Sequence, residues 1–274
     1  MQTQVDDLAR IVRQLRHDIL NISYQGKVGH IGSAFSIIDI LAVLYYKILK
    51  IDPSDPFATS RDRFLLSKGH AASALYTVLC RRNFFSQEEL LTFCQNGGRL
   101  AVHPENTTLP GIEYASGSLG HGLSVASGLA LAGKKEKDSF RVFVLTSDAE
   151  CNEGSTWEAA LFAPQHHLDN LVAIVDYNKM QAMGRTEDII QLEPFSHKWR
   201  SFGWEVKEIE GHDLNEMKEW FSKTPLQKGK PTVFIAHTVL GKGISFMENQ
   251  LSWHYLTMTE DLYKKAIEEI NRDL

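Results

Sequence analysis

The stretch RVFVLTSDAECNEGSTWEAALFAPQHHLDNLVAIVDYN, residues 141–178, decides the fold. It begins with an apolar, β-branched run at 141–146 and ends with a second one at 171–177. Between them lies a helical pattern at 155–167, whose first residues, Ser155 to Glu158, have the spacing of a capping box. Short apolar runs of this kind are typical of strands buried on both faces, and a helix between two of them predicts a unit with parallel strands.

The same alternation continues on both sides of this unit. Further strands are predicted at 63–67 and 232–239, and further helices at 5–23, 36–50, 119–137 and 215–222. The sequence therefore predicts an α/β fold, a parallel sheet with helices on both faces, in which ligands bind outside the carboxyl ends of the strands. Because no repeat or long linker interrupts the pattern, a single domain over residues 1–274 is expected.

Composition narrows the class of protein. A net charge of -5 disfavours a nucleic-acid-binding role, since such proteins carry a basic face. The longest apolar stretch, at 37–49, contains Asp39 and Lys47 and is expected to be too short to cross a membrane. Three cysteines without disulfide or zinc spacing, and an N-terminus without a signal-peptide pattern, favour the cytoplasm.

Two polar side chains follow the strands of the deciding stretch. Asp148 comes after the first strand and Asn178 after the second, so the two are expected at neighbouring strand ends. A carboxylate beside an amide oxygen suits Mg²⁺, which keeps open positions for phosphate oxygens and water. The alternative is that Asp148 caps a helix and Asn178 forms a turn, and the spacing leaves both interpretations open.

Four histidines lie beside glycine or proline in loop contexts: His30, His70, His103 and His121. A single histidine of this kind is usually only a turn residue, whereas four together favour a site that contacts phosphate or moves protons. The glycines of 117–122 lack the G-x-G-x-x-G spacing, which makes a nicotinamide site a weak alternative. A Walker loop and a nucleophile elbow are both absent.

Taken in order, the segments from about residue 11 to about residue 262 resemble the N-terminal, diphosphate-binding domain of transketolase, a thiamine diphosphate enzyme. The resemblance rests on seven strings in the right order and on Trp253-His254. The strings are GHIGSAFSIIDILAVLYY, RDRFLLSKGH, HPE, PGIEYASGSLGHGLS, EGSTWEA, DNLVAIVDYNKMQAMG and VLGKGISFMEN.

The resemblance implies a cofactor, thiamine diphosphate, and a metal ion, Mg²⁺. Asp148, the Asn178 side chain and the Met180 backbone carbonyl would hold the metal. The implied cofactor contacts are His70 and His254 at or next to the diphosphate, and Gly117 and Leu119 against the aminopyrimidine and thiazolium rings.

Other residues would serve the substrate and the assembly. The resemblance places His103 near the terminal hydroxyl of the donor, and His30 with His254 near the hydroxyl whose proton moves. These three are the expected catalytic residues. Glu153 would lie at a dimer interface, in a carboxylate network with the partner.

Two positions depart from the family pattern. The family has Gly-Asp-Gly around its metal aspartate, whereas this chain has Ser147-Asp148-Ala149. Ala149 therefore adds a Cβ beside the expected diphosphate, and backbone freedom is lost. The family's His-Gly near the end is His254-Tyr255 here, which is expected to narrow the substrate channel.

Transketolases continue into a second, pyrimidine-binding domain that the 274 residues do not contain. The chain is therefore expected to be one subunit of a split transketolase. With a separate pyrimidine-binding subunit, as a heterotetramer with two copies of each chain, it would transfer a two-carbon ketol unit between sugar phosphates. No nucleic acid and no membrane is expected as a partner.

Two alternatives stay open. The chain could belong to a specialised enzyme that transfers a two-carbon or acyl unit to a non-standard acceptor, or it could be a non-catalytic binding subunit. A catalytic subunit predicts Mg²⁺-dependent cofactor binding and turnover with a partner. A non-catalytic one predicts a complex without turnover.

Overall fold

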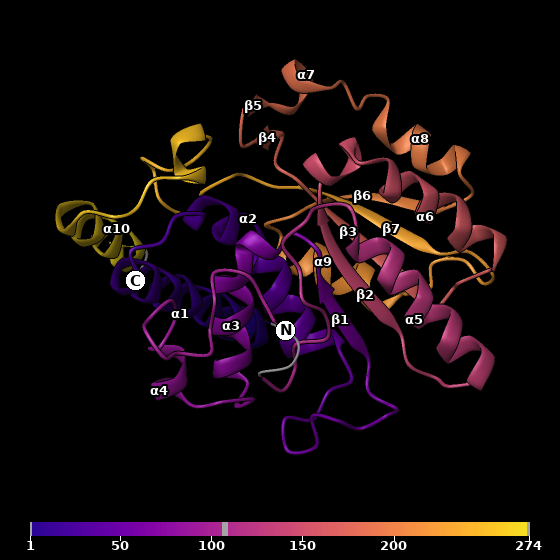
Figure 1. Cartoon of the computed structure of the whole chain (residues 1–274), viewed down its shortest axis with the longest axis horizontal. Coiled ribbons are helices and arrows are strands. Elements are labelled where there is room, and N and C mark those ends of the chain that lie inside the picture. The colour runs from indigo at the N-terminus through magenta and orange to yellow at the C-terminus, as the bar shows by residue number, and fades with distance from the viewer. Residues whose placement is uncertain (1, 106–108, 273–274) are drawn as a thin grey trace.

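The computed structural model describes residues 2–105 and 109–272 and shows a central five-stranded sheet with helices on both faces (Figure 1). The strands are β1 (Arg63–Leu66), β2 (Val142–Ser147), β3 (Leu171–Tyr177), β6 (Glu205–Glu210) and β7 (Thr232–His237). They lie in the order β1-β2-β3-β7-β6, and every neighbouring pair is parallel. The predicted α/β class and four of the five strands are confirmed. The edge strand β6 was not predicted.

The order of the strands determines which helices cover which face. The chain moves in one direction across the sheet through β1, β2, β3 and β6, and then turns back to β7. Because crossovers between parallel strands are right-handed, the helices that lead directly into β2, β3 and β6 fall on one face and the helix that leads into β7 falls on the other. Accordingly α5 (Gly122–Glu136), α6 (Gly154–Gln165) and α8 (Phe195–Ser201) pack on one side, and α9 (Leu214–Ser222) packs on the opposite side (Figure 1).

The side chains of each strand alternate between two hydrophobic clusters. Phe143 and Leu145 of β2 belong to the larger cluster, which α9 shares with α1 (Gln2–Gly26), α2 (Ile31–Val43), α3 (Ala72–Arg81) and α10 (Glu260–Arg272). Val142 and Val144 belong to the smaller cluster under α5, α6 and α8. Burial on both faces explains why these strands are continuous apolar runs.

The remaining elements are short. They are the π-helical turn η1 (Leu44–Ile48), the 3-10 turns η2 (Gly69–Ala71), η3 (Ala149–Asn152) and η4 (Leu251–His254), the helices α4 (Gln87–Leu90) and α7 (Thr186–Ile189), and the hairpin of β4 (Met180–Gln181) with β5 (Gly184–Arg185). The loops at the carboxyl edge of the sheet therefore carry several of these turns, and the polar side chains gather there.

The helix predicted at 36–50 begins earlier than expected. Among the described residues one helical window, Ile31–Ile48, is long and apolar enough by length and composition to cross a membrane, which corrects the expectation that it is too short. However, 89% of this window is buried inside the structure. Its buried Asp39 is paired with Arg16 at 2.6 Å, as in the core helix of a globular domain. This window is therefore weak evidence for a membrane segment.

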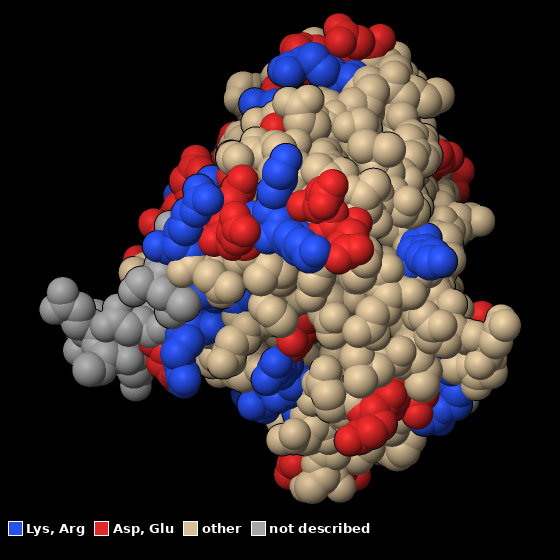
Figure 2. Space-filling model, turned by 90° about the vertical axis from the view of Figure 1, so that its left-hand side faces the viewer, with Lys and Arg blue, Asp and Glu red and all other residues tan. Residues whose placement is uncertain are grey.

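The face that carries the C-terminal part of the chain has a mixed surface charge. In Figure 2, Lys and Arg side chains lie among Asp and Glu side chains on this face, with wide uncharged areas between them. Several of the charges are paired on α10, for example Lys264 with Glu260 at 2.6 Å. This face therefore has no extensive area of one sign.

Candidate functional site

A cavity of about 230 Å³ lies at the carboxyl edge of the sheet. It is lined by His30, Ser33, Lys68, His70, His103, Gly117, Leu119, Ser147, Ala149, Asn178, Met180, Gln181, Ala182 and His254. These residues come from the start of α2, from the segments that follow β1 and β3, from the segment between α4 and α5, from the end of β2 and the turn after it, and from η4. Segments that are far apart in the sequence thus form one pocket where parallel sheets bind ligands.

Most of the residues expected from the sequence meet in this cavity. Nine of the predicted site residues line it: His30, His70, His103, Gly117, Leu119, Ala149, Asn178, Met180 and His254. Asp148 is fully buried beside them and is not a lining residue. Glu153 lies outside the cavity, exposed at the N-terminus of α6, and His121 is exposed before α5.

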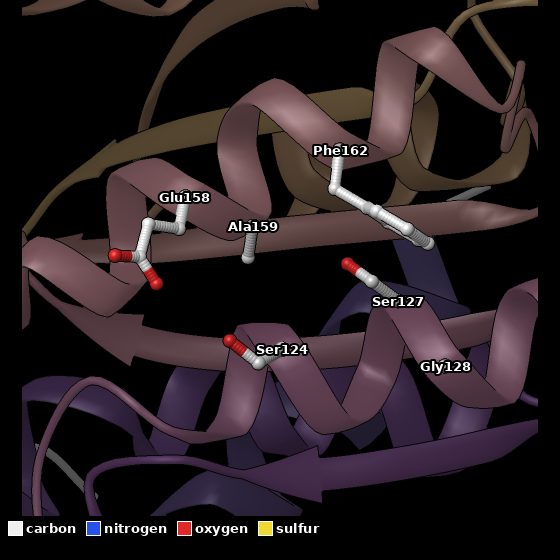
Figure 3. Close-up of a pocket in the computed structure, with 6 residues that line it drawn as sticks. All are labelled: Ser124, Ser127, Gly128, Glu158, Ala159 and Phe162. Atoms are coloured by element: carbon white, nitrogen blue, oxygen red, sulfur yellow. The ribbon is translucent and has the colours of Figure 1, made fainter.

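A second hollow lies between α5 and α6 on the outside of the sheet (Figure 3). Its walls are Ser124, Ser127 and Gly128 of α5 and Glu158, Ala159 and Phe162 of α6. Phe162 leans across it from α6 in Figure 3. None of the predicted site residues lines this groove.

Asp148 is a buried carboxyl with only neutral hydrogen-bond donors around it. One of its oxygens accepts from the Ala149 amide at 2.8 Å, and the other accepts from the Lys179 amide at 3.0 Å and from Thr186 Oγ1 at 2.8 Å. Burial raises the pKa of Asp148 to about 7, the Thr186 bond opposes this, and the charge of Asp176 adds to it. A cation beside this carboxyl would offset the cost of burying its charge.

The predicted metal ligands lie together at the ends of β2 and β3, which are adjacent parallel strands. Asn178 Oδ1 accepts from the Met180 amide at 2.9 Å. The other two predicted ligand residues, Asn178 and Met180, are therefore hydrogen-bonded to each other. Carboxylate, amide and carbonyl oxygens are the hard donors that Mg²⁺ prefers. Among the described residues no group of three or more His, Cys, Asp or Glu side chains could hold a metal ion. A set with one carboxylate fits Mg²⁺, whose other positions go to water and phosphate oxygens.

Three of the cavity histidines are kept uncharged by their surroundings. Burial lowers the pKa of His254 to about 4, and burial holds the pKa of His70 well below its ordinary value. Burial also lowers the pKa of His30, and the nearby His103 is the second cause of this shift. The positive charge of Lys68 contributes to all three shifts.

Two of these rings present unpaired nitrogens. Nδ1 of His30 and Nε2 of His254 are buried and have no hydrogen-bond partner among the residues that the structure describes. Buried polar atoms without partners are rare and mark places where a ligand completes the hydrogen bonding. His30 is also the N-cap of α2 in a left-handed conformation, with φ 63°, which is uncommon for a residue other than glycine. Both observations fit a cavity that is shaped for a polar ligand.

Glu150 holds the walls of the cavity together and was not predicted from the sequence. Its buried carboxyl accepts from Ser67 Oγ, from the Gly120 amide at 2.9 Å and from the Ser147 amide at 3.0 Å. These bonds join the loop after β1, the loop before α5 and the end of β2. The position of the predicted cofactor loop around Gly117 is therefore set by a side chain in η3.

Ser155 does not form the predicted capping box. Helix α6 begins at Gly154 with Glu153 as its N-cap, and there is no side-chain capping bond. Instead, Ser155 Oγ donates to the Gly120 carbonyl at 2.9 Å. Because the helix already begins at Gly154, Ser155 lies inside its first turn, and its hydroxyl holds the predicted cofactor loop instead.

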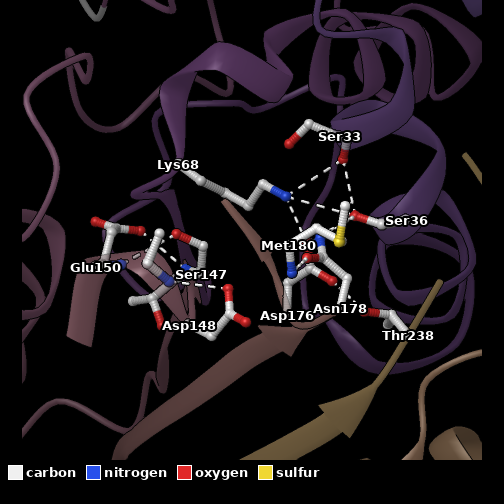
Figure 4. A network of polar contacts seen from close by, with 12 residues as sticks. Ser33, Ser36, Lys68, Ser147, Asp148, Glu150, Asp176, Asn178, Met180 and Thr238 are labelled. Carbon is white, nitrogen blue, oxygen red and sulfur yellow. Dashed lines mark hydrogen bonds and ion pairs between the residues drawn. The ribbon is translucent and has the colours of Figure 1, made fainter. Parts of the chain in front are cut away.

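Lys68 and Asp176 were also missed. They form an ion pair at 2.5 Å whose side chains are 1% and 0% exposed. Figure 4 shows Lys68 reaching over the carboxyl edge of the sheet toward Asp176 and Asn178, while Asp148 and Glu150 lie on the other side of the network. The sequence signal that could have indicated this pair is one acidic residue, Asp176, inside the apolar run 171–177.

The departures at Ser147 and Ala149 do not strain the backbone. β2 ends at Ser147, Asp148 has φ −61° and ψ −35°, and Ala149 begins η3, so none of the three needs a conformation reserved for glycine. The loss of glycine's backbone freedom therefore causes no strain in this turn. The Ala149 side chain does line the cavity and takes up space there.

Tyr255 lies beside the cavity with 61% of its surface exposed. Its ring centroid is 6.3 Å from that of His30 and 6.2 Å from that of His254. The backbone of Tyr255 also packs against Gly29, where an added Cβ would lie 2.7 Å from the Tyr255 carbonyl oxygen. The backbone of Tyr255 is therefore closely packed, and its ring lies next to two of the predicted catalytic histidines.

Comparison with known proteins identifies relatives of similar length. An apulose-4-phosphate transketolase subunit from Phocaeicola vulgatus is 40% identical over 268 residues, which cover 98% of this chain and 95% of that protein. The 6-deoxy-6-sulfo-D-fructose transketolase subunit SqwG of a Clostridium species is 39% identical over 272 residues, which cover 99% of this chain and 98% of that protein.

Solved transketolases have the same fold over a longer chain. The Campylobacter jejuni enzyme superposes with a TM-score of 0.83 at 31% identity, over 96% of this chain and 42% of that one. The Pichia stipitis enzyme with fructose 6-phosphate superposes with a TM-score of 0.89 at 25% identity, over 96% of this chain and 40% of that one. The chain therefore spans less than half the length of these solved enzymes.

The family comparison agrees with both sets of relatives. Residues 5–270 match the family described as "Transketolase, thiamine diphosphate binding domain". This match covers the whole cavity and all five strands of the sheet. The chain belongs to the transketolase family, as a carrier of its thiamine diphosphate binding domain.

Proposed function

We propose that the chain is the diphosphate-binding subunit of a two-chain transketolase and acts only together with a separate pyrimidine-binding subunit. The observation that carries this proposal is the near full-length match, in both directions, to proteins that are themselves named as transketolase subunits. In this proposal residues 1–274 work as one domain in the cytoplasm, and the enzyme is a heterotetramer with two copies of each chain.

Thiamine diphosphate would occupy the cavity at the carboxyl edge of the sheet. Asp148, Asn178 Oδ1 and the Met180 carbonyl would hold Mg²⁺, supported by their common place at the ends of β2 and β3. His70 and Ala149 would lie beside the diphosphate. Gly117, Leu119 and His254 would complete the cofactor contacts, as further lining residues of the cavity.

When bound, thiamine diphosphate supplies the nucleophilic carbon needed to cleave and form a carbon–carbon bond next to a carbonyl. The chain's own residues bind, orient and move protons. His30 and His254 lie in the cavity with lowered pKa values, so their rings are neutral near pH 7 and can accept a proton from a substrate hydroxyl. His103, in the same cavity wall, would bind the terminal hydroxyl of the donor.

The partner subunit would cover the open side of the cavity. Glu153 is exposed at the start of α6, close to the Gly120 loop, and is proposed to face a partner there. Exposed apolar side chains near the cavity mouth, Met183 at 74% and Tyr255 at 61%, are consistent with a surface that another chain buries.

The experiment that tests the proposal is co-purification of the tagged chain from its source in the presence of Mg²⁺. Native mass spectrometry and thiamine analysis of the eluate follow, with the Asp148→Ala variant as the matched control. A second chain of similar size, with thiamine diphosphate bound to the unaltered protein and lost from Asp148→Ala, is expected. A lone chain without cofactor would contradict the proposal and would favour a non-catalytic binding protein.

A non-standard substrate is a second candidate. The relatives in Phocaeicola vulgatus and Clostridium are named for apulose 4-phosphate and 6-deoxy-6-sulfo-D-fructose, and the centroid of the Tyr255 ring lies 6.3 Å from that of His30. The test is a panel of ketose donors, assayed with the two subunits reconstituted into one complex. The complex that contains the parent chain is compared with the complex that contains Tyr255→Gly. Wider donor use by Tyr255→Gly is expected if the ring selects the substrate, and an unchanged donor profile would contradict that.

A further inference from the structure

Asp176 is the centre of the polar network beneath the cavity (Figure 4). Its Oδ2 accepts from Lys68 Nζ at 2.5 Å, from Ser36 Oγ at 2.6 Å and from Asn178 Nδ2 at 3.1 Å. Its Oδ1 accepts from Thr238 Oγ1. This side chain therefore joins α2, the loop after β1, the end of β3 and the residue after β7.

The network determines which way the Asn178 amide faces. Nδ2 donates to the carboxylate of Asp176, and Oδ1 accepts from the Met180 amide at 2.9 Å. A half-turn of the amide would place its oxygen against the carboxylate and its NH₂ group against the Met180 N–H, which replaces two hydrogen bonds with two repulsive pairs. The oxygen of Asn178 thus has one orientation, and its second lone pair is left for a ligand.

We infer that Asp176, charge-balanced by Lys68, is a positioning residue that keeps the Asn178 oxygen directed at the magnesium site. This inference rests on the proposed function, because it gives a role to residues around a metal that the cofactor brings. Neither Asp176 nor Lys68 is among the ligands themselves. Both act through Asn178, as hydrogen-bonding partners commonly orient the ligands of a metal.

A simpler explanation is that the Lys68–Asp176 pair only ties four chain segments together. The pair is fully buried, and removing one partner leaves an uncompensated charge, which destabilises a fold whatever the site does. Single substitutions cannot separate the two explanations. The test therefore has to remove both charges and vary only the acceptor that faces Asn178.

Two double variants make this comparison. Lys68→Met with Asp176→Asn keeps an oxygen that can accept from Asn178, whereas Lys68→Met with Asp176→Leu has nearly the same shape and no acceptor. Both carry the same charge. Each is purified as the complex of the full chain with its partner subunit, and thiamine diphosphate binding is measured by titration calorimetry with and without Mg²⁺. The ratio of the two dissociation constants is the coupling factor between metal and cofactor.

The positioning role predicts that the leucine pair loses coupling by about tenfold or more, the usual effect of removing a partner of a metal ligand. The asparagine pair is expected to stay close to the parent. Equal coupling factors in the two double variants would overturn the inference, because the acceptor would then have no effect on the metal. Thermal unfolding of each complex shows whether the fold is retained, and Asp176→Val replaces leucine in the same comparison if the leucine pair does not fold.

A rescue experiment adds an independent readout. Asn178→Asp in the leucine background presents an oxygen whichever way the side chain turns, so it is expected to restore the coupling. If coupling stays low, the loss comes from a changed cavity and the inference is wrong. Thr238→Val serves as a control, since it removes only the bond on Oδ1, and its coupling factor is expected to equal that of the parent.

The proposed function and the positioning role of Asp176 are overturned by different results. An unaltered complex that binds no thiamine diphosphate would overturn the proposed function and this inference with it. Normal Mg²⁺-dependent binding by the unaltered complex, together with unchanged coupling in the leucine pair, would overturn the inference alone.

Discussion

A methyl group added at Gly122 tests whether the cavity loop is as closely packed as the structure indicates. Gly122 is the first residue of α5, and its amide donates to Ser67 Oγ at 3.1 Å. A Cβ at this position would lie 2.2 Å from Ser67 Oγ, 2.4 Å from Ser67 Cβ and 3.0 Å from Ser67 Cα. Because Ser67 also donates to Glu150, neither side can move without disturbing the loop before α5.

The size of the effect follows from the clash. Overpacking of a well-packed region costs about 1–3 kcal/mol. The gain in helix propensity from glycine to alanine offsets at most about 1 kcal/mol. Gly122→Ala is therefore expected to lower the free energy of unfolding by about 1–2 kcal/mol, or the melting temperature by several degrees. Gly128, on the same helix, has no atom within 4 Å of its added Cβ. Gly128→Ala is expected to raise stability by about 0.5–1 kcal/mol.

The assay is urea unfolding of the full chain followed by far-UV circular dichroism, for the parent and both variants. Thiamine diphosphate binding is then measured at saturating Mg²⁺ with the partner present. Gly122→Ala is expected to bind more weakly because its clash displaces the loop that carries Gly117 and Leu119. A Gly122→Ala protein as stable as the parent, or two variants that shift alike, would refute the packing argument.

Three further predictions concern the site. Asp148→Ala is expected to abolish Mg²⁺-dependent cofactor binding, measured by calorimetry, and normal binding would remove Asp148 from the metal site. His30→Ala and His103→Ala are expected to lower kcat or raise the KM for the donor while cofactor affinity stays near that of the parent; an intact kcat/KM in both would contradict their roles. Burial, the largest cause, lowers the pKa of His254 to about 4, below the ordinary value of about 6.5. As the pH falls from about 6.5 toward 4, the unfolded chain binds a proton that the folded chain does not, and the free energy of unfolding is expected to fall by about 3 kcal/mol. Unfolding of His254→Gln between these pH values should show a flatter dependence than the parent, and an identical slope would contradict the shift.

The parallel sheet could be predicted from sequence because its central strands are buried on both faces. Residues 141–146 and 171–177 are continuous apolar runs, and the structure has strands at Val142–Ser147 and Leu171–Tyr177. The edge strand Glu205–Glu210 was not predicted because its sequence, EVKEIE, has only two apolar residues, Val206 and Ile209, and each lies between charged residues. Helix α2 begins before the predicted residue 36 because His30 adopts a left-handed conformation that no local pattern announces.

Most of the residues that line the cavity could be predicted from the sequence, whereas the buried residues that support them could not. The strand-end argument brought Asp148 and Asn178 together, and the resemblance added the histidines that line the cavity. Lys68, Glu150 and Asp176 were missed because buried charges are stabilised by partners distant in sequence, such as Asp176 for Lys68, 108 positions away. Sequence patterns describe neighbours along the chain, whereas these contacts exist only after the sheet has formed.

The cavity also has a consequence for synthesis of the protein on the ribosome. Its lining extends from His30 to His254, and the sheet pairs residues 63–66 with 142–145 and residues 172–177 with 232–237. Non-local pairings of this kind form slowly, and β7 is the last strand to emerge during translation. A nascent chain therefore exposes Asp148 and Asn178 before it has the final wall of the pocket. Capture of the cofactor is therefore expected only after the chain as far as His254 has emerged and folded.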